Sequence, residues 1–351
     1  MKAVRFHEHG GPEVLRYEDV PDPAIKANEV LVQVRACAMN HLDLWLRRGY
    51  PGRQIPLPRI VGSDIAGDVV RVGDLVTAAK PGQRVLIAPG HSCGLCEHCL
   101  GGRDNFCRQY SIFGIVRDGG YAELVSAPDV NVIPIPEQMT FDEAAAVPLV
   151  FLTAWHMLVG RAGLRAGEEV LVLGAGSGVG SAAMQIARLL NARVIATAGS
   201  DEKLARARQL GADEVINHAT QDIHQEVKRM TNKRGVDVVF EHVGAATWEK
   251  STMSLAPGGR LVTCGATTGT DARIELRYLF GRQLSILGSF MGSKAELLEV
   301  LKFVFSGRLK PVIDSTFPLP EARAAHERME RRELFGKIIL HPGGAAIGCA
   351  L

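Results

Sequence analysis

Four cysteines lie close together in the sequence, at Cys93, Cys96, Cys99 and Cys107. Two residues separate the first from the second and the second from the third, and seven residues separate the third from the fourth. Cysteine thiolates are preferred ligands of Zn²⁺, and four of them can close a tetrahedron around one ion. Because every ligand is a thiolate, no position is left for water. The spacing therefore predicts one structural zinc per chain.

A glycine-rich segment over residues 174–180 offers a second kind of chemistry. It follows a continuous apolar run at 170–173 and precedes a stretch with helical apolar spacing at 181–190. Small residues at such a turn let backbone N–H groups approach the pyrophosphate of a dinucleotide at a helix N-terminus. No window reads strictly G-x-G-x-x-G, but the strand before it and the helix after it support the interpretation. The residues predicted to bind the cofactor here are Gly176, Ser177, Gly178, Val179 and Gly180.

The residues after the next strand, expected over 194–197, indicate which dinucleotide binds. Neither Ala198 nor Gly199 can accept a hydrogen bond from a ribose 2′-OH as a carboxylate would. Ser200 and Lys203 could instead hold a 2′-phosphate, which favours NADP, with NAD as the alternative. A solvated helix face explains Lys203 almost as simply. We expect Asp201 to cap the following helix.

Composition limits the classes of protein that this chain can belong to. Its 351 residues suit two domains, and 46% hydrophobic with 22% charged residues is the balance of a globular protein. The net charge of +2 does not favour nucleic acid or an anionic membrane as a partner. The longest apolar stretch, residues 144–155, contains Pro148 and is too short to span a bilayer, which needs about 20 residues. We expect a cytoplasmic protein that acts on a small molecule.

The elements that must position these residues change in character along the chain. The first 130 residues contain short alternating strands separated by glycine turns, at 30–36, 65–72, 84–88 and 121–126, which predicts a small barrel or sandwich. From residue 170 onwards strands alternate with helices, which predicts a doubly wound parallel sheet. After a strand at 284–288, helices at 294–306 and 321–331 and a strand at 337–340 are expected to return to the first domain. The fold class is thus α/β plus β.

The cysteine cluster and the glycine turn, in this order, resemble the medium-chain dehydrogenase/reductase superfamily, which includes zinc alcohol dehydrogenases and quinone oxidoreductases. The likeness covers essentially the whole chain, and the matching stretches are 1–5, 11–15, 62–67, 81–85, 119–123, 152–155 and 335–340. The resemblance implies a GroES-like domain (1–150 with 291–351, including a zinc lobe at 91–108) and a Rossmann domain (151–290). It also implies a catalytic cleft between the domains. A homodimer or homotetramer is implied as well, often joined through the strand near 284–288.

Departures from the family pattern indicate the chemistry. The resemblance places the three catalytic zinc ligands of the alcohol dehydrogenases, Cys, His and Cys, at Asn40, Ser63 and Leu149. It also places the Thr of the proton relay at Leu42. Leucine cannot bind zinc, and neutral Ser and Asn side chains are poor ligands. The structural zinc is expected to be kept and the catalytic zinc lost.

The stretch Asn40-x-x-Asp43 resembles that of the zinc-free quinone reductases, in which a tyrosine near the position of Tyr50 often lies at the cleft. A site without a Lewis acid must polarise its substrate with hydrogen bonds. That suits reduction of a quinone, an enone or a reactive carbonyl better than oxidation of an alcohol. The candidate catalytic residues are Asn40, His41, Asp43, Asp64 and Tyr50.

The resemblance also implies residues that contact the cofactor beyond the glycine turn. Stretches that line the nicotinamide in the family match Thr153, Val243, Gly265 and Ser289, and His218 matches a position near the adenosine phosphate. Ligands of open α/β sheets bind outside the carboxyl ends of the strands, which agrees with these positions.

Two alternatives remain open from the sequence. His41, Asp43, Asp64 and His91 are all metal-capable and could assemble a substitute zinc site of an alcohol dehydrogenase. A protein of another class, which binds NADPH without turnover, would carry the same glycine turn. A short-chain dehydrogenase is excluded because no tyrosine is followed four residues later by lysine. Cys37, Cys264 and Cys349 are interpreted as single thiols.

Overall fold

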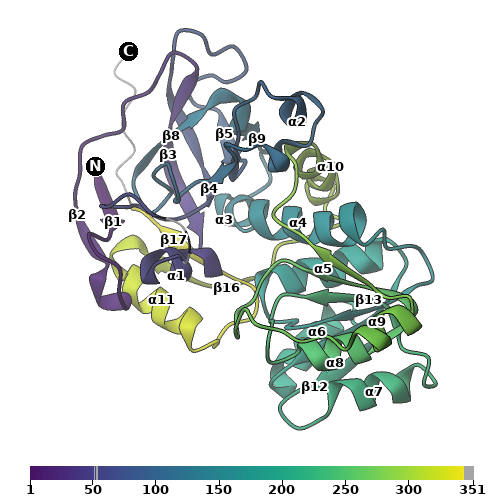
Figure 1. Cartoon of the computed structure of the whole chain (residues 1–351). Helices are drawn as coiled ribbons and strands as arrows, with labels where there is room; N and C mark the ends of the chain where they lie inside the picture. Colours follow the sequence, from purple (N-terminus) through teal and green to yellow (C-terminus); the bar gives the residue numbers. More distant parts are fainter. Residues whose placement is uncertain (51, 53, 344–351) are drawn as a thin grey trace. The chain divides into compact units, whose positions relative to one another are not determined.

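The computed structural model describes residues 1–50, 52 and 54–343, and it divides into two compact units (Figure 1). Unit 1 contains Met1–Leu149, Ser293–Leu297 and the segment that begins at Lys310. Unit 2 contains Val150–Gly292 and Leu298–Leu309. Cys349 lies outside the described residues.

Helix α10 (Lys294–Phe305) contributes mainly to unit 2, whereas the sequence placed all of 291–351 in the first domain. The reason is packing against helix α4 (Pro148–Trp155). Trp155 stacks on Phe303 of α10 with ring centroids 5.4 Å apart, and its indole N–H donates to Glu299 at 3.3 Å. Apolar contacts thus hold the body of α10 on unit 2.

A mostly antiparallel sheet forms the frame of unit 1. Its strands run in the order β16-β17-β3-β4-β5-β9, with β8 also paired to β3. Their bounds are β3 Glu29–Ala38, β4 Asp64–Val72, β5 Arg84–Ile87, β8 Leu124–Pro128, β9 Val132–Pro134, β16 Ile313–Pro318 and β17 Lys337–His341. Smaller strand pairs are formed by β1 (Lys2–Arg5) with β2 (Arg16–Asp19) and by β6 (Gly90–His91) with β7 (Ser111–Ile112).

The strand expected at 121–126 begins later, at Leu124. Tyr121 is instead buried in an irregular segment. Its N–H donates to the Val61 carbonyl, and its own carbonyl accepts from the Val4 N–H.

Helices α1 (His41–Arg48) and α11 (Ala322–Glu330) lie side by side in unit 1 (Figure 1). Helix α1 follows β3 directly and begins after Asn40, whose backbone N–H donates to the Asp43 carboxylate at 2.8 Å. The helix ends at Gly49, whose φ of 97° lies in the left-handed region that favours glycine. Two shorter helices, α2 (Glu97–Leu100) and α3 (Phe141–Ala145), complete the unit's α-helices among the described residues.

Unit 2 is a doubly wound parallel sheet of six strands in the order β12-β11-β10-β13-β14-β15. The strands are β10 Glu169–Val172, β11 Arg193–Ala198, β12 Glu214–Asn217, β13 Val236–Glu241, β14 Leu255–Thr263 and β15 Ser285–Gly288. The helices that accompany them, besides α4 and α10, are α5 Gly178–Leu189, α6 Asp201–Gln209, α7 Ile223–Met230, α8 Trp248–Met253 and α9 Leu276–Gly281. The predicted fold class is confirmed.

The order of the strands reverses at β10, which pairs with β11 on one side and with β13 on the other. Such a switch point opens a crevice at the carboxyl ends of the strands, where ligands of this architecture bind. The core beneath it is aliphatic, with Leu171, Ile195 and Val239 fully buried. Within the described residues, no helix combines the length and the apolar character needed to cross a bilayer.

Candidate active site and metal centre

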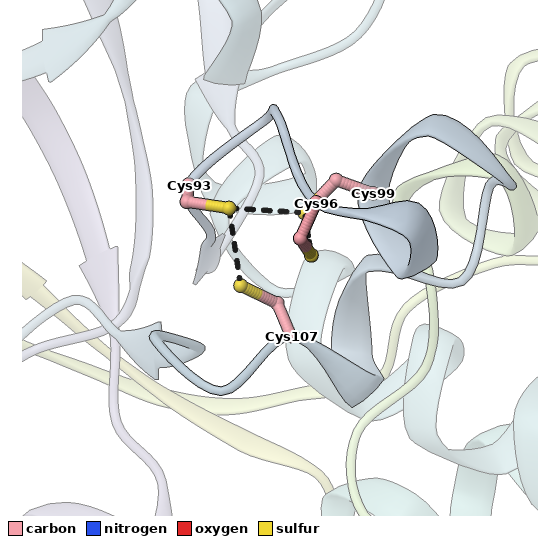
Figure 2. Close-up of side chains that lie close together, drawn as sticks. All are labelled: Cys93, Cys96, Cys99 and Cys107. Atoms are coloured by element: carbon pink, nitrogen blue, oxygen red, sulfur yellow. Dashed lines mark hydrogen bonds between the residues drawn. The ribbon is translucent and has the colours of Figure 1, made fainter.

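The four cysteines converge on one point in a lobe of unit 1 (Figure 2). The Sγ atoms of Cys93 and Cys99 lie 3.8 Å apart, those of Cys96 and Cys99 3.5 Å, and those of Cys107 and Cys93 3.5 Å. A tetrahedron with Zn–S bonds of about 2.3 Å has S···S edges of about 3.8 Å. The chain therefore holds four thiols at the spacing that a zinc ion requires.

Backbone geometry prepares this lobe for an ion. Gly94 and Gly102 have φ values of 73° and 70°, which let the chain turn sharply between ligands. Backbone N–H groups of Leu95 and Cys96 lower the pKa of the Cys93 thiol, whereas burial and the neighbouring thiols raise the pKa of Cys96. A lowered pKa favours the thiolate, which is the form that binds metal. With four sulfur ligands the site would be closed to water and its role structural.

A buried ion pair lies just beyond the end of β3 in unit 1. The Lys337 ammonium donates to Asn40 Oδ1 at 2.6 Å and to Asp64 Oδ2 at 2.9 Å, and Asn40 Nδ2 donates to the same Asp64 oxygen at 2.9 Å. Lys337 is 3% exposed and Asp64 is fully buried. Strand pairing explains their meeting, because β3 pairs with both β4 and β17, which begin at Asp64 and Lys337.

The three positions aligned with catalytic zinc ligands do not offer a zinc site. Asn40 is committed to the ion pair, and Leu149 contributes only its backbone N–H, which donates to Asp64 Oδ1 at 2.8 Å. Ser63 is fully buried, and its hydroxyl has no hydrogen-bond partner. An amide, a hydroxyl and an alkyl side chain do not match the thiolate and imidazole donors that zinc prefers.

The substitute metal site is also not formed. Among residues 1–50, 52 and 54–343, the cysteine cluster is the only group of three or more Cys, His, Asp or Glu side chains whose ligand atoms come together. The structure therefore does not bring His41, Asp43, Asp64 and His91 together into one group. The physical reason is that Asp43 and Asp64 direct their oxygens to hydrogen bonds within unit 1.

Asp43 is fully buried in the first turn of α1. Its Oδ1 accepts from Gly62 N–H at 3.1 Å, and its Oδ2 accepts from Asn40 N–H at 2.8 Å and from the Tyr121 hydroxyl at 3.4 Å. Burial raises the pKa of this carboxyl to about 6, against the opposing effect of those N–H donors. With both oxygens engaged inside the fold, Asp43 supports the start of α1.

Two other candidate residues remain partly accessible on α1 and just beyond it. His41 and Tyr50 are half-buried and both contact Trp45, with ring centroids 5.8 Å and 6.3 Å from the indole. Both contacts are edge-on, which is a favourable arrangement of aromatic rings. Asn40, at 6% exposed, completes this group.

Sequence reasoning did not identify Lys337, Tyr121 or His326 as site residues. Tyr121 and Lys337 fall in stretches that match the family, but no local spacing connects them with α1. His326 lies 205 residues from Tyr121, and its Nε2 is 3.2 Å from the phenol oxygen. Only the pairing of sheet strands and the packing of α11 on α1 bring these side chains together.

The glycine turn of unit 2 has the features of a pyrophosphate site. Ser177 caps α5, and its hydroxyl accepts from Gly180 N–H at 2.9 Å. A Cβ on Gly180 would come within 2.4 Å of the Gly174 carbonyl, so this position requires glycine. Helix α5 has no acidic residue in its first turn, so the positive end of its dipole favours a bound anion. Gly176, Gly178 and Val179 belong to the same turn and first helical turn.

The candidate nicotinamide residues lie just beyond strand ends of unit 2. Val243 follows β13, Gly265 follows β14 and Ser289 follows β15. The Ser289 hydroxyl is buried without a hydrogen-bond partner, although its N–H donates to Thr263 at 2.8 Å. This hydroxyl is therefore available to a polar group of a bound cofactor. Thr153 lies on α4, where it is buried beside Met291.

Glu241 stabilises the loop that follows β13. The sequence did not identify it as a site residue. It is fully buried at the end of β13. Its Oε1 accepts from the N–H groups of Val243 and Gly244 at 2.6 and 3.1 Å, and its Oε2 accepts from the hydroxyls of Thr247 and Ser251 at 2.9 and 2.6 Å. Four donors satisfy one carboxylate, so the loop beside the predicted nicotinamide site is fixed.

The adenosine end of the predicted cofactor site lies after β11. Ser200, and not Asp201, caps α6, because the Ser200 hydroxyl accepts from Lys203 N–H at 3.4 Å while Asp201 accepts from the Asn217 amide at 2.8 Å. His218 is exposed, and its Nδ1 lies 3.4 Å from the Thr197 hydroxyl. Lys203 is half-buried on the first turn of α6. The residues present thus fit a nicotinamide dinucleotide.

Comparison with known proteins agrees with this description. Residues 26–137 match the alcohol dehydrogenase GroES-like domain, and residues 178–306 match the zinc-binding dehydrogenase domain. The quinone oxidoreductase of Rattus norvegicus is 36% identical over 348 residues, which cover 97% of each chain. The NAD-dependent alcohol dehydrogenase of Sulfolobus acidocaldarius is 33% identical over 97% of this chain and 99% of its own. A crystal structure of an NAD-dependent alcohol dehydrogenase superposes with a TM-score of 0.95 at 48% identity, over 98% of this chain and 100% of the other.

The chain therefore belongs to the medium-chain dehydrogenase/reductase superfamily. Within it, the chain is a medium-chain NAD(P)-dependent oxidoreductase.

Proposed function

We propose that this protein transfers a hydride from NADPH to an electron-poor acceptor, a quinone, an enone or a reactive carbonyl, without a catalytic zinc. The observation that carries the proposal is the Lys337 ammonium, which is buried in contact with Asn40 Oδ1 and Asp64 Oδ2. Asn40 aligns with a zinc ligand of the alcohol dehydrogenases, and here its amide oxygen accepts a hydrogen bond from a side-chain cation.

This ion pair determines which way the Asn40 amide faces. Because Lys337 only donates, it must meet the amide oxygen, and Asn40 Nδ2 gives one proton to Asp64. The second Nδ2 proton remains available to an acceptor oxygen. A cation on the amide oxygen strengthens that N–H as a donor, since linked hydrogen bonds polarise one another. His41 and Tyr50 are half-buried donors of the same region.

Hydrogen bonds of this kind suffice for an acceptor that is already electron-poor. A bound dihydronicotinamide would supply the hydride. Asn40 and its neighbours would stabilise the negative charge that develops on the acceptor oxygen. Oxidation of an unactivated alcohol would instead require a lower pKa of its hydroxyl, and a bound metal is what lowers that pKa.

The preference for NADPH is supported by the residues after β11. Ala198 and Gly199 bring no carboxylate to the ribose, and Asp201 is engaged with Asn217. The Ser200 hydroxyl accepts one bond as the helix cap and keeps its proton for a phosphate oxygen. Lys203 would add the positive charge.

A second candidate is NAD-linked alcohol oxidation, which the names of two relatives favour. A third is NADPH binding without turnover. The test is metal content by inductively coupled plasma mass spectrometry, together with NADPH and NADH oxidation with a quinone, an enone and an aldehyde. The proposal expects about one zinc per chain, retained activity with a chelator that spares the cysteine lobe, and higher kcat/KM with NADPH.

Each other outcome supports a different candidate. About two zinc ions per chain, with activity lost as the second leaves, would return the protein to the alcohol dehydrogenases. Tight NADPH binding with no oxidation by any acceptor would favour the protein without turnover.

Lys203→Ala, compared with Lys228→Ala on an exposed face of α7, tests the cofactor preference. The first should weaken NADPH binding about tenfold and leave NADH unchanged.

We also propose that two copies of this protein associate through the β15 edge of the unit 2 sheet. Strand β15 ends the order of strands, and a free edge can pair with a second copy. Ile286 on that strand and Phe280 and Phe290 beside it are 37%, 70% and 52% exposed. Light scattering after gel filtration should give a dimer or tetramer, and Ile286→Lys should shift it towards monomer.

A further inference from the structure

A hydrogen-bonded chain of four buried polar side chains connects α1 with α11. The proposed reaction does not use it. Arg47 on α1, His326 on α11, Tyr121 and Asp43 are each fully buried. Arg47 Nη1 lies 3.1 Å from His326 Nδ1, His326 Nε2 lies 3.2 Å from the Tyr121 oxygen, and that oxygen lies 3.4 Å from Asp43 Oδ2. Buried polar groups cost free energy unless they are paired, so a fully linked chain of four calls for a role.

The hydrogen bonds in this chain all run in one direction. Arginine can only donate, so His326 Nδ1 must accept and the imidazole proton must lie on Nε2. That Nε2–H then donates to the Tyr121 oxygen, and the phenol proton is left for Asp43 Oδ2. Burial and the adjacent Arg47 lower the pKa of His326 to about 3, which agrees with a neutral ring.

The outer end of the chain is anchored. Arg47 Nε donates to the Gly10 carbonyl at 3.2 Å, and its Nη2 pairs with Glu330 on α11. Arg48 also contacts Glu330, at 2.8 Å. Because a guanidinium does not lose its proton in proteins, the chain cannot pass a net proton from Asp43 to the surface. Its physical effect is orientation.

Asp43, at the other end of this hydrogen-bonded chain, contacts the candidate active site. Asp43 holds the backbone N–H of Asn40 on one side and that of Gly62 on the other. Asn40 and His41, which begin α1, are the proposed donors to the acceptor. The phenol of Tyr121 thus touches the carboxylate that fixes their backbone.

We propose that Tyr121 and His326 are positioning residues, which act through Asp43 to hold Asn40 and His41 in the geometry that binds the acceptor. This inference rests on the proposed function. It assigns to helix α11, near the C-terminal end of the described residues, a part in substrate affinity without contact to the substrate.

The experiment uses the full-length protein with Tyr121→Phe, His326→Leu, His326→Gln and the double variant Tyr121→Phe/His326→Leu. Tyr110→Phe, a buried tyrosine in another part of unit 1, is the matched control. We expect Tyr121→Phe and His326→Leu each to raise KM for the quinone about tenfold, with KM for NADPH and the zinc content unchanged. Glutamine can still donate to Tyr121, so His326→Gln should recover most of the loss.

A shared pathway has a further signature. Because both residues act through Asp43, the double variant should be no worse than Tyr121→Phe alone, whereas independent effects would multiply to about a hundredfold. A multiplied effect, or an unchanged KM for the quinone in both single variants, would overturn the inference.

A readout that needs no turnover separates this inference from the proposed function. Amide hydrogen exchange at Asn40 and Gly62, followed by NMR, should accelerate at least tenfold in Tyr121→Phe and stay unchanged in Tyr110→Phe. If the wild-type protein reduces no acceptor, the proposed function fails, and exchange still decides whether Tyr121 positions these N–H groups. Unchanged exchange at both sites would overturn the positioning role by itself.

Discussion

Lys337 Nζ and Asn40 Oδ1 lie 2.6 Å apart although their positions in the chain differ by 297. The contact joins the first residue of β17 to the residue that precedes α1. Asp64, at the start of β4, closes the triangle with bonds to both. The candidate active site is thus built around an ion pair that three separate segments of unit 1 contribute.

Removal of Lys337 should destabilise the protein strongly. Lys337→Met would leave the Asp64 carboxylate buried beside a thioether, and breaking a buried pair in this way costs about 3–5 kcal/mol. The free energy of unfolding, measured with urea, should fall by that amount. Lys337→Met/Asp64→Asn removes both charges and should recover more than half of the loss. A double variant as unstable as the single one would contradict the ion-pair argument.

Asn40 should contribute to turnover as well as to stability, because its buried amide also bonds to Lys337 and Asp64. Asn40→Ala removes the proposed amide donor to the acceptor oxygen, and loss of one such donor typically costs 10²–10³ in kcat. We expect kcat/KM for the quinone to fall about 100-fold, with NADPH affinity unchanged in a fluorescence titration. Asn28→Ala, at an exposed position, is the control. A fall of less than about threefold would mean that Asn40 does not face the acceptor.

Asp43 should make stability depend on pH. Burial raises the pKa of its carboxyl from 3.8 to about 6, with Asp64 adding to the rise and Lys337 opposing it. The folded state therefore binds more protons than the unfolded chain between about pH 4 and pH 6. The free energy of unfolding contributed by this group falls as the pH rises through that window, by about 3 kcal/mol for a shift of about two pKa units.

The measurement must separate Asp43 from His326, which acts in the opposite sense. Because the pKa of His326 is lowered to about 3, the unfolded chain takes up a proton below about pH 6.5 and stability is lost as the pH falls. The difference in unfolding free energy between wild type and Asp43→Asn cancels that contribution. It should decline from pH 4 to pH 7, and a difference independent of pH would contradict the raised pKa.

Loss of the cysteine lobe should leave cofactor binding intact. Cys107→Ser removes one of the four proposed zinc ligands, and zinc content should drop from about one per chain to well below one. The midpoint of thermal unfolding should fall by several degrees, because a structural zinc contributes its binding energy to folding. NADPH affinity should be unchanged, since the glycine turn belongs to unit 2. Full zinc content in the variant would mean that the ion binds elsewhere.

The sequence predicted the features that local spacing encodes and missed those that depend on distant strands. The cysteine spacing and the glycine turn between β10 and α5 are local signals, and both lie where the pattern placed them. The cap of α6 was misplaced by one residue, because Ser200 and Asp201 are both good caps and only backbone geometry distinguishes them. No periodicity could connect Tyr121 with His326, since strand order and helix packing create that contact.

The pairing of β17 with β3 also has a consequence for synthesis on the ribosome. Unit 2 lies within Val150–Leu309, so all its residues are made before those of α11 and β17. The sheet of unit 1 is closed by a strand that begins at Lys337, far along the chain from β3. Domains generally fold as units during translation, and contacts of long sequence separation form late. Unit 2 is therefore expected to fold before the sheet of unit 1 is complete, and Asn40 can form its contact with Lys337 only after β17 has been synthesised.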